Sequence, residues 1–243
     1  MTDPDLTLLQ ESSENVSLIS SQFQAESEKN QLQMIPNLAS AGEAGLDVLM
    51  DFLRSNQSTP ISLVKGKVYQ TLYQVNTSQT QDFLSTYFPT GVVPLDSDRQ
   101  IDYRLLQKLL VEGDFQTADS LTRQKLCELA GEAAIGRKWL YFTEVEKFPL
   151  TDLHTINSLW WVHSEGKFGF SVQRKIWLSV GEDFPKLWPK INWKNGNNWT
   201  QYPNEFIWNL NAPAGHLPLL NQLRGVRVAA SLYNHPVWEE KGW

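Results

Sequence analysis

The tryptophans of this chain are confined to its second half, and this distribution divides the chain in two. All ten tryptophans lie from Trp139 onward, and so do all four histidines. Residues 1–98 carry twelve acidic and four basic side chains, a net charge of −8, whereas residues 99–243 carry fifteen acids and seventeen bases. A shift this sharp predicts two domains, over residues 1–95 and 99–243, joined near residues 94–98.

The composition is that of a folded globular protein. The 243 residues are 41% hydrophobic and 20% charged, and no apolar run reaches the length of a membrane span. The first thirty residues carry acids and glutamines in place of a basic end and an apolar run, so we expect neither a signal nor a transit peptide. The lone Cys127 excludes an internal disulfide and a cysteine-based zinc cluster. These features favour an intracellular protein.

Apolar residues recur at helical spacing in both halves, which predicts an all-α fold. The first half shows four short helical segments that would pack as a small bundle, suited to an interaction scaffold or to a bland spacer. The second half opens with a helical hairpin that turns at Gly113, followed by a helix over residues 151–163 with Thr151 or Asp152 as its cap. Irregular chain rich in tryptophan and proline leads to a last helix over residues 217–233.

The last predicted helix carries two arginines that lack a nearby acid. Asn221, Arg224 and Arg227 are three residues apart and would share one side of the helix, and the sequence from 206 to 238 holds no Asp or Glu. A guanidinium on a largely apolar helix needs a partner. A ligand carboxylate or phosphate would serve, because arginine binds both in a forked geometry. An acid elsewhere in the fold would also serve; the candidates are Glu144, Glu146 and Asp152.

Aromatic side chains narrow the chemistry of such a ligand. Phe142, Trp199 and Tyr202 beside leucines and arginines would suit a flat, mostly apolar anion. Tryptophan richness is equally consistent with a plain core, so both interpretations stay open at this point.

Several blocks in the second half resemble the genomes-uncoupled-four family, in order and with matched spacing. The blocks are KLCELA (125–130), RKWLYFTEVEKFP (137–149), DLHTIN (152–157), FGFSVQ (168–173) and GHLPLLNQLRGVRV (215–228). That family comprises tetrapyrrole-binding activators of magnesium chelatase in oxygenic phototrophs. The resemblance covers residues 99–243, and the first half resembles the helical domain of cyanobacterial members.

The resemblance implies an all-helical core shaped like a cupped hand, preceded by a helical-repeat-like bundle. Its apolar palm would hold protoporphyrin IX or magnesium protoporphyrin IX, and a mobile loop over residues 193–202 would close it. Family members often carry Trp where this chain has Tyr202. The site residues implied by the resemblance are Asn221, Arg224, Arg227, Phe142, Phe115, Arg123, Trp199 and Tyr202.

The function implied is that of a non-catalytic regulator. It would present porphyrin to the large porphyrin-binding subunit of magnesium chelatase and so stimulate chlorophyll biosynthesis. We expect a monomer in the cytoplasm of a cyanobacterium-like cell, with peripheral association to the thylakoid surface left open. The alternative is a helical protein-interaction scaffold whose tryptophan-rich half is only a core.

Two other classes of protein are disfavoured. No nucleotide-binding loop, HExxH or nucleophile-elbow motif occurs, and His154 and His163, nine residues apart, would lie on opposite sides of a helix. We therefore expect no enzyme and no metal site, and we expect His163 to be exposed or interfacial. Lysines interleaved with Trp188 and Trp193 suit single-stranded nucleic acid, but the neighbouring acids and the net charge of −6 count against it.

Overall fold

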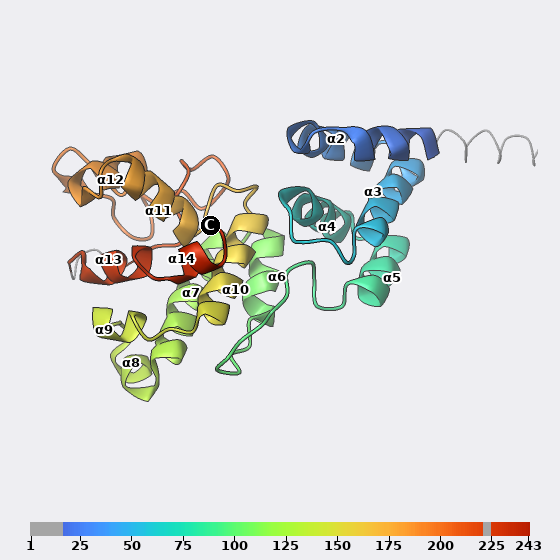
Figure 1. The fold of residues 1–243 in the computed structure, drawn as a ribbon. Coiled ribbons are helices and arrows are strands. Elements are labelled where there is room, and N and C mark those ends of the chain that lie inside the picture. The colour runs from blue at the N-terminus through green and yellow to red at the C-terminus, as the bar shows by residue number, and fades with distance from the viewer. Residues whose placement is uncertain (1–16, 221–224) are drawn as a thin grey trace, which may run out of the picture. The chain divides into compact units, whose positions relative to one another are not determined.

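The chain divides into two compact units, Met1–Val92 and Val93–Trp243, in a computed structural model that describes residues 17–220 and 225–243. The division falls just before the linker predicted over residues 94–98. Helices dominate both units, so the predicted all-α fold is confirmed (Figure 1). None of the described helices is both long and apolar enough to cross a membrane.

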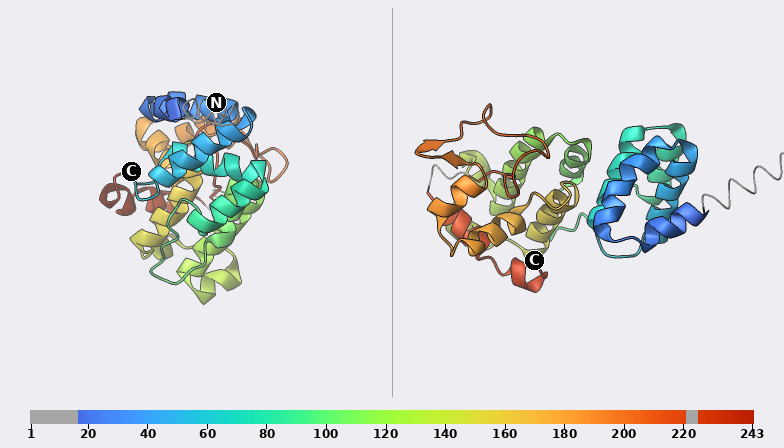
Figure 2. Two further views of the ribbon diagram at one scale, coloured as in Figure 1. Left: turned by 90° about the vertical axis from the view of Figure 1, so that its right-hand side faces the viewer. Right: turned by 90° about the horizontal axis from the view of Figure 1, so that it is seen from above.

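The first unit is a small bundle in which α4 packs against α2, α3 and α5 (Figure 2). Ser27, Ser62 and Thr77 each start a helix by accepting a hydrogen bond from a backbone N–H three residues later. Gly45 allows α2 and α3 to cross closely, because a Cβ there would lie 1.9 Å from the Leu38 carbonyl oxygen. The helices are residues 17–25, α2 (Glu28–Ser40), α3 (Glu43–Ser55), α4 (Leu63–Val75) and α5 (Ser78–Tyr87).

The second unit opens with the predicted helical hairpin. Gly113 joins its two helices with a φ of +77°, a left-handed conformation that glycine adopts without steric cost. Two short helices follow the hairpin. The helices of the hairpin are α6 (Arg104–Glu112) and α7 (Phe115–Ala130), and the short ones are α8 (Glu132–Arg137) and α9 (Phe142–Val145).

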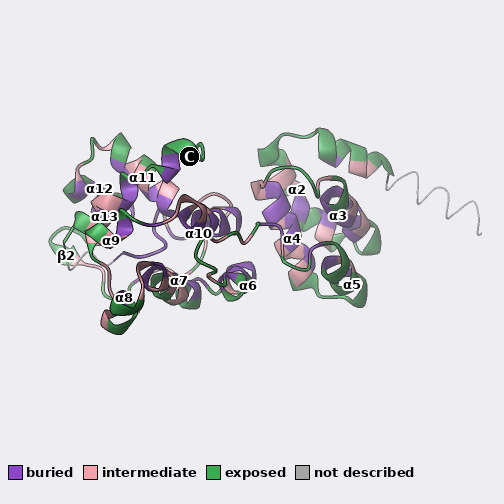
Figure 3. Ribbon diagram, turned by 60° about the horizontal axis from the view of Figure 1, so that its bottom comes forward, coloured by how far each residue is buried: buried purple, intermediate pink, exposed green. Residues whose placement is uncertain are grey.

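Helix α10 (Leu150–Val162) lies in the middle of the second unit, with nine of its 13 residues buried (Figure 3). The predicted cap is wrong: Pro149 precedes the helix, and no side chain caps it. Asp152 is buried instead and accepts hydrogen bonds from the Ser97 hydroxyl at 2.5 Å and the Tyr103 hydroxyl at 2.8 Å. The Asp152 carboxylate therefore makes tertiary hydrogen bonds instead of capping the helix.

The tryptophan- and proline-rich segment is more regular than its sequence indicates. Helix α11, which the sequence analysis missed, precedes a helix and a short antiparallel hairpin. Trp193 is fully buried, stacks on Trp188 at a centroid distance of 5.4 Å and donates from Nε1 to the His216 carbonyl oxygen. The elements are α11 (Phe170–Ser179), α12 (Phe184–Lys190), β1 (Lys194–Asn195), β2 (Asn198–Trp199), α13 (Arg227–Tyr233) and α14 (Val237–Glu240).

The last predicted helix is wrong at its start, because α13 begins at Arg227 and residues 217–220 are not helical. Gln173 Nε2 donates to the Pro218 carbonyl oxygen at 2.7 Å, and the Leu219 N–H donates to the Asp119 carboxylate at 2.6 Å. These tertiary bonds fix backbone groups that a helix would use. Gly225, with a φ of +92°, also lies outside the right-handed helical region.

Candidate functional site

A small cavity of about 80 Å³ lies in the second unit. Helix α7, the segment after α8 and the chain on both sides of residues 221–224 form it. Its walls are mostly apolar, and two cations reach it. The lining residues are Arg123, Leu126 and Cys127 from α7, Lys138, Trp139 and Leu140 after α8, and Leu219, Leu220 and Val228.

Arg123 connects this cavity to the loop that carries Tyr202. Its Nη2 lies 3.2 Å from both the Tyr202 hydroxyl and the Ser120 hydroxyl, and its Cζ lies 5.0 Å from the centroid of the Tyr202 ring. Its Nε lies 3.4 Å from Asp119 Oδ2. The side chain remains 44% exposed, so its guanidinium is still accessible to a carboxylate from solvent.

Asp119 fixes one wall of the cavity from inside the core. The residue is fully buried, and its Oδ1 accepts the Leu219 N–H at 2.6 Å. Burial raises the pKa of Asp119 to about 6, although the Arg123 charge and the Leu219 N–H both lower it. The contact joins residues 100 positions apart in the sequence.

We expect the stability of the chain to depend on pH through Asp119. Its pKa is about 6 in the folded state against an ordinary 3.8, so between these values the folded state binds more protons than the unfolded state. The contribution of Asp119 to the free energy of unfolding should therefore fall as pH rises from about 4 to 6, by at most about 3 kcal/mol. Buried His163, whose pKa is lowered to about 3, contributes with the opposite sign over the same range, so the Asp119 contribution has to be measured as a difference between wild type and variant. Urea denaturation at pH 4, 5, 6 and 7 measures this dependence.

The matched variants are Asp119→Asn, which keeps an acceptor for the Leu219 N–H, and Glu112→Gln at an exposed position of α6. The free energy of unfolding of the wild type minus that of Asp119→Asn should fall between pH 4 and 6, whereas the same difference for Glu112→Gln should stay nearly constant. A difference between wild type and Asp119→Asn that does not change with pH would contradict the raised pKa of Asp119.

Two further predicted site residues, Phe142 and Arg227, meet at an open groove of about 570 Å³ next to the cavity. The Arg227 Cζ lies 5.5 Å from the Phe142 ring centroid, and the Ser231 hydroxyl donates to the Phe142 carbonyl oxygen at 3.0 Å. Cavity and groove adjoin, because Leu140 and Val228 line the former while Phe142 and Arg227 line the latter.

Two of the predicted site residues, Phe115 and Trp199, do not line the cavity. Phe115 is only 4% exposed and packs against Trp160 and Phe168, with centroid distances of 6.0 and 5.4 Å. Trp199 lies on β2, with its ring 5.9 Å from that of Trp188. Asn221 and Arg224 lie outside the described residues, so their role stays a prediction.

Two of the acids considered as partners for the arginines are engaged elsewhere. Glu144 binds Arg137 at 2.7 Å, and Asp152 binds Tyr103. Glu146 does line the groove beside Arg227, but Arg227 makes no ion pair with any residue in the described part of the chain. The charge of Arg227 is thus directed over an aromatic ring and toward solvent.

Sequence reasoning missed Asp119, Lys138 and Trp139 as neighbours of the cavity. Asp119 precedes Arg123 by four residues, a spacing that places both on one helix face and would have indicated their ion pair. Nothing local indicated Leu219, whose position depends on a contact across 100 residues.

The histidines do not form a metal site in residues 17–220 and 225–243, where no group of three or more ligand-type side chains converges. The expectation that His163 is exposed or interfacial is wrong. It caps α10 and is fully buried, and burial lowers its pKa to about 3. Trp188 and Trp193 are buried as well, so they are not available for stacking on bases.

The fold and the cavity define a class of all-helical protein in which an N-terminal helical unit precedes a core with an arginine-edged apolar cavity. Residues 96–236 match the family model described as GUN4-like, and residues 7–89 match the ARM-like repeat domain at the GUN4 N-terminus. The chain therefore belongs to the GUN4-like family.

Curated relatives support this membership. The Ycf53-like protein of Synechocystis sp. is 57% identical over 233 residues, which cover 95% of this chain and 100% of that protein. The chloroplastic tetrapyrrole-binding protein of Arabidopsis thaliana is 41% identical over 145 residues, 56% of this chain and 55% of that protein.

Two solved structures match more than half of the chain. GUN4 from Chlamydomonas reinhardtii is 41% identical with a TM-score of 0.57, and the match covers 60% of this chain and 94% of that one. Ligand-free GUN4 of Arabidopsis thaliana is also 41% identical, with a TM-score of 0.53 and coverage of 57% and 98%.

Proposed function

We propose that the second unit binds protoporphyrin IX and magnesium protoporphyrin IX at the arginine-edged cavity and its adjoining groove. The observation that carries the proposal is an apolar cavity lined by Arg123 and Lys138, together with the groove lined by Arg227 and Phe142. A tetrapyrrole is flat and apolar, with two propionates at one edge. Family membership and the relative named a tetrapyrrole-binding protein support the same ligand class.

The energetics suit such a ligand. Burying ~400 Å² of apolar surface would contribute about 10 kcal/mol before ordering costs. Lost translational freedom and loop ordering offset much of that gain, which leaves micromolar or tighter binding. The arginines would set the orientation of the propionates more than the gross affinity.

Binding requires the cavity to widen. Its 80 Å³ is well below the ~300–1,000 Å³ of ordinary small-molecule pockets. Widening would separate the wall at Trp139 and Leu140 from the wall at Leu219 and Leu220. The Asp119–Leu219 hydrogen bond fixes the second of these walls to α7.

The role proposed for the bound porphyrin is regulatory. The chain would hold protoporphyrin IX or its magnesium form in an apolar site and present it to the large porphyrin-binding subunit of magnesium chelatase. No covalent step is required of this chain. We further propose that the protein acts as a monomer in the cytoplasm of a cyanobacterium-like cell and can meet the thylakoid surface. The Synechocystis relative, which matches 95% of this chain, supports a cyanobacterial setting.

A chelatase assay tests this role. Purified magnesium chelatase with ATP, Mg²⁺ and limiting deuteroporphyrin should form magnesium porphyrin several-fold faster when the chain is added. The variant Arg123→Gln/Arg227→Gln should give little stimulation, whereas Arg54→Gln/Arg104→Gln should behave like the wild type. Equal rates with and without the wild-type chain would contradict the regulatory role while leaving porphyrin binding to be judged by its own titration.

A further inference from the structure

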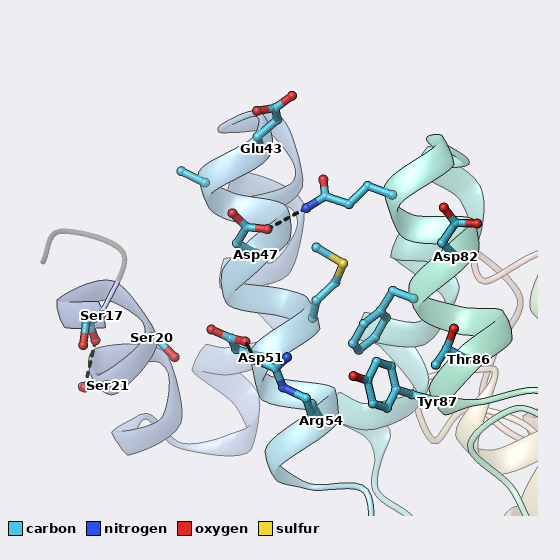
Figure 4. A pocket seen from close by; sticks show the side chains of 14 residues that line it. Ser17, Ser20, Ser21, Glu43, Asp47, Asp51, Arg54, Asp82, Thr86 and Tyr87 are labelled. Carbon is cyan, nitrogen blue, oxygen red and sulfur yellow. Dashed lines mark hydrogen bonds and ion pairs between the residues drawn. The ribbon is translucent and has the colours of Figure 1, made fainter. Parts of the chain in front are cut away.

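The first unit contains an open groove that the porphyrin site does not use. The groove, of about 1120 Å³, lies between α3, α5 and the helix over residues 17–25 (Figure 4). All of its lining residues belong to the first unit. Any function it has is therefore separate from the cavity of the second unit.

Carboxylates follow one wall of the groove at regular spacing. Glu43, Asp47 and Asp51 lie four residues apart along α3, so they form a row about 12 Å long on one helix face (Figure 4). Asp82 adds a fourth carboxylate from α5. The single cation of the lining, Arg54, is already paired with Asp51. The groove thus carries a net negative charge.

Apolar side chains form the floor between these walls. Met50 of α3 is buried below the acidic row, and Phe83 and Tyr87 of α5 pack together with a centroid distance of 5.1 Å. Tyr87 remains 38% exposed, although it is large and apolar. An apolar floor with an acidic rim is an amphipathic surface that nothing in the described chain covers.

The shape of the groove fits a helix. Two of its walls are helix faces, with lining residues at the spacing i, i+3, i+4 and i+7 along α5. Its volume is comparable to the ~1,300 Å³ of three turns of an α-helix 10 Å across. Amphipathic helices are commonly recognised by grooves of this kind.

We propose that this groove binds a basic amphipathic helix of a partner protein. The partner's apolar stripe would rest on Met50, Phe83 and Tyr87, and its lysines or arginines would meet the carboxylates of α3 and α5. The charge disfavours nucleic acid and anionic lipid as occupants. It also disfavours residues 1–16 of the same chain, which hold four acids and no Lys or Arg.

The probe for the test is a fluorescein-labelled 18-residue peptide of leucine and lysine, with the leucines at helical spacing. Its control is an isomer of the same composition in which the two residues alternate, so that no helical stripe forms. Fluorescence anisotropy with the full chain measures both affinities at two salt concentrations. We expect saturable binding of the striped peptide with a Kd on the order of 10 µM, and at least tenfold weaker binding of its isomer.

Matched variants locate the binding. The variant Asp47→Lys/Asp82→Lys reverses the sign of the charge of the groove. The control Glu26→Lys/Glu112→Lys makes the same change in net charge at exposed positions outside the groove. The groove variant should lose at least tenfold in affinity, and the control should stay within about twofold. The milder variant Asp47→Asn/Asp82→Asn keeps the side-chain shapes and should also lose affinity. It replaces the charge reversal as the test if the charge reversal proves to disturb folding.

Three outcomes would overturn the proposal. One is equal binding of the striped peptide and its isomer, which would mean charge attraction alone. Another is equal loss in the groove and control variants. The third is a wild-type dimer in sedimentation that the groove variant abolishes, which would assign the groove to a second copy of this chain.

Discussion

Replacing Arg123 and Arg227 together with glutamine is expected to weaken deuteroporphyrin binding by about 10- to 100-fold. Each arginine offers a charge-assisted hydrogen bond to a propionate, worth about 1 kcal/mol or more at a partly exposed site. Arg123 lines the cavity, and Arg227 lines the adjoining groove over Phe142. The Kd from quenching of tryptophan fluorescence measures the loss.

The matched control for this variant is Arg54→Gln/Arg104→Gln. Both control arginines are exposed, each pairs with an aspartate, and neither lines the cavity or the groove of the second unit. The control should bind within about twofold of the wild type, and circular dichroism should report the same helix content in all three proteins. Equal affinities in the arginine variant and the control would contradict the site.

The variant Arg224→Ala tests a site residue that was predicted from the sequence alone. It should weaken deuteroporphyrin binding as well.

Filling the cavity is expected to have a larger effect. Val228 lines the cavity from the start of α13 and is only half-buried, so Val228→Trp can place an indole in the 80 Å³ space without displacing a fully buried side chain. The indole would occupy the cavity that a porphyrin has to enter in order to bind. We expect the affinity for deuteroporphyrin to fall at least 100-fold.

Val226→Trp provides the control for added bulk. Val226 lies two residues earlier, is 40% exposed and does not line the cavity. Its variant should bind porphyrin like the wild type, and thermal unfolding should show both tryptophan variants folded. If Val228→Trp binds as tightly as Val226→Trp, the porphyrin enters elsewhere.

Local sequence signals predicted those elements whose ends are set by local chemistry. Gly113 makes the predicted turn of the hairpin, and Gly42 and Asn76 stand at helix ends between the short helical segments of the first unit. These positions need a left-handed or otherwise special backbone conformation, which the residue type itself indicates.

Long-range contacts decided the elements that sequence reasoning misplaced. The helix expected from residue 217 fails because Gln173 and Asp119 bind the backbone there, and both lie on other helices. Asp152, expected as a cap, is buried against Ser97 and Tyr103. The spacing of apolar residues along the sequence does not indicate such contacts.

The candidate site was predictable only in part, because long-range contacts shape some of its walls. Arg227 was indicated by its spacing on a helix without acids, Phe142 and Tyr202 by the aromatic pattern, and Arg123 only by the family resemblance. Arg123 meets Tyr202 in the fold, and Phe142 meets Arg227, but neither pairing was predicted. The cavity wall at Leu219 depends on its hydrogen bond to Asp119, which no spacing along the chain reveals.

The most direct test of porphyrin binding is a titration of the wild-type chain with deuteroporphyrin and its magnesium form, followed by tryptophan fluorescence at two salt concentrations. Trp139 lines the cavity, so a porphyrin bound there should quench it. We predict saturable quenching with one ligand per chain at micromolar concentration, changing little with salt. An absence of saturable quenching would mean that the tryptophan-rich half is only a core, and it would contradict the porphyrin site.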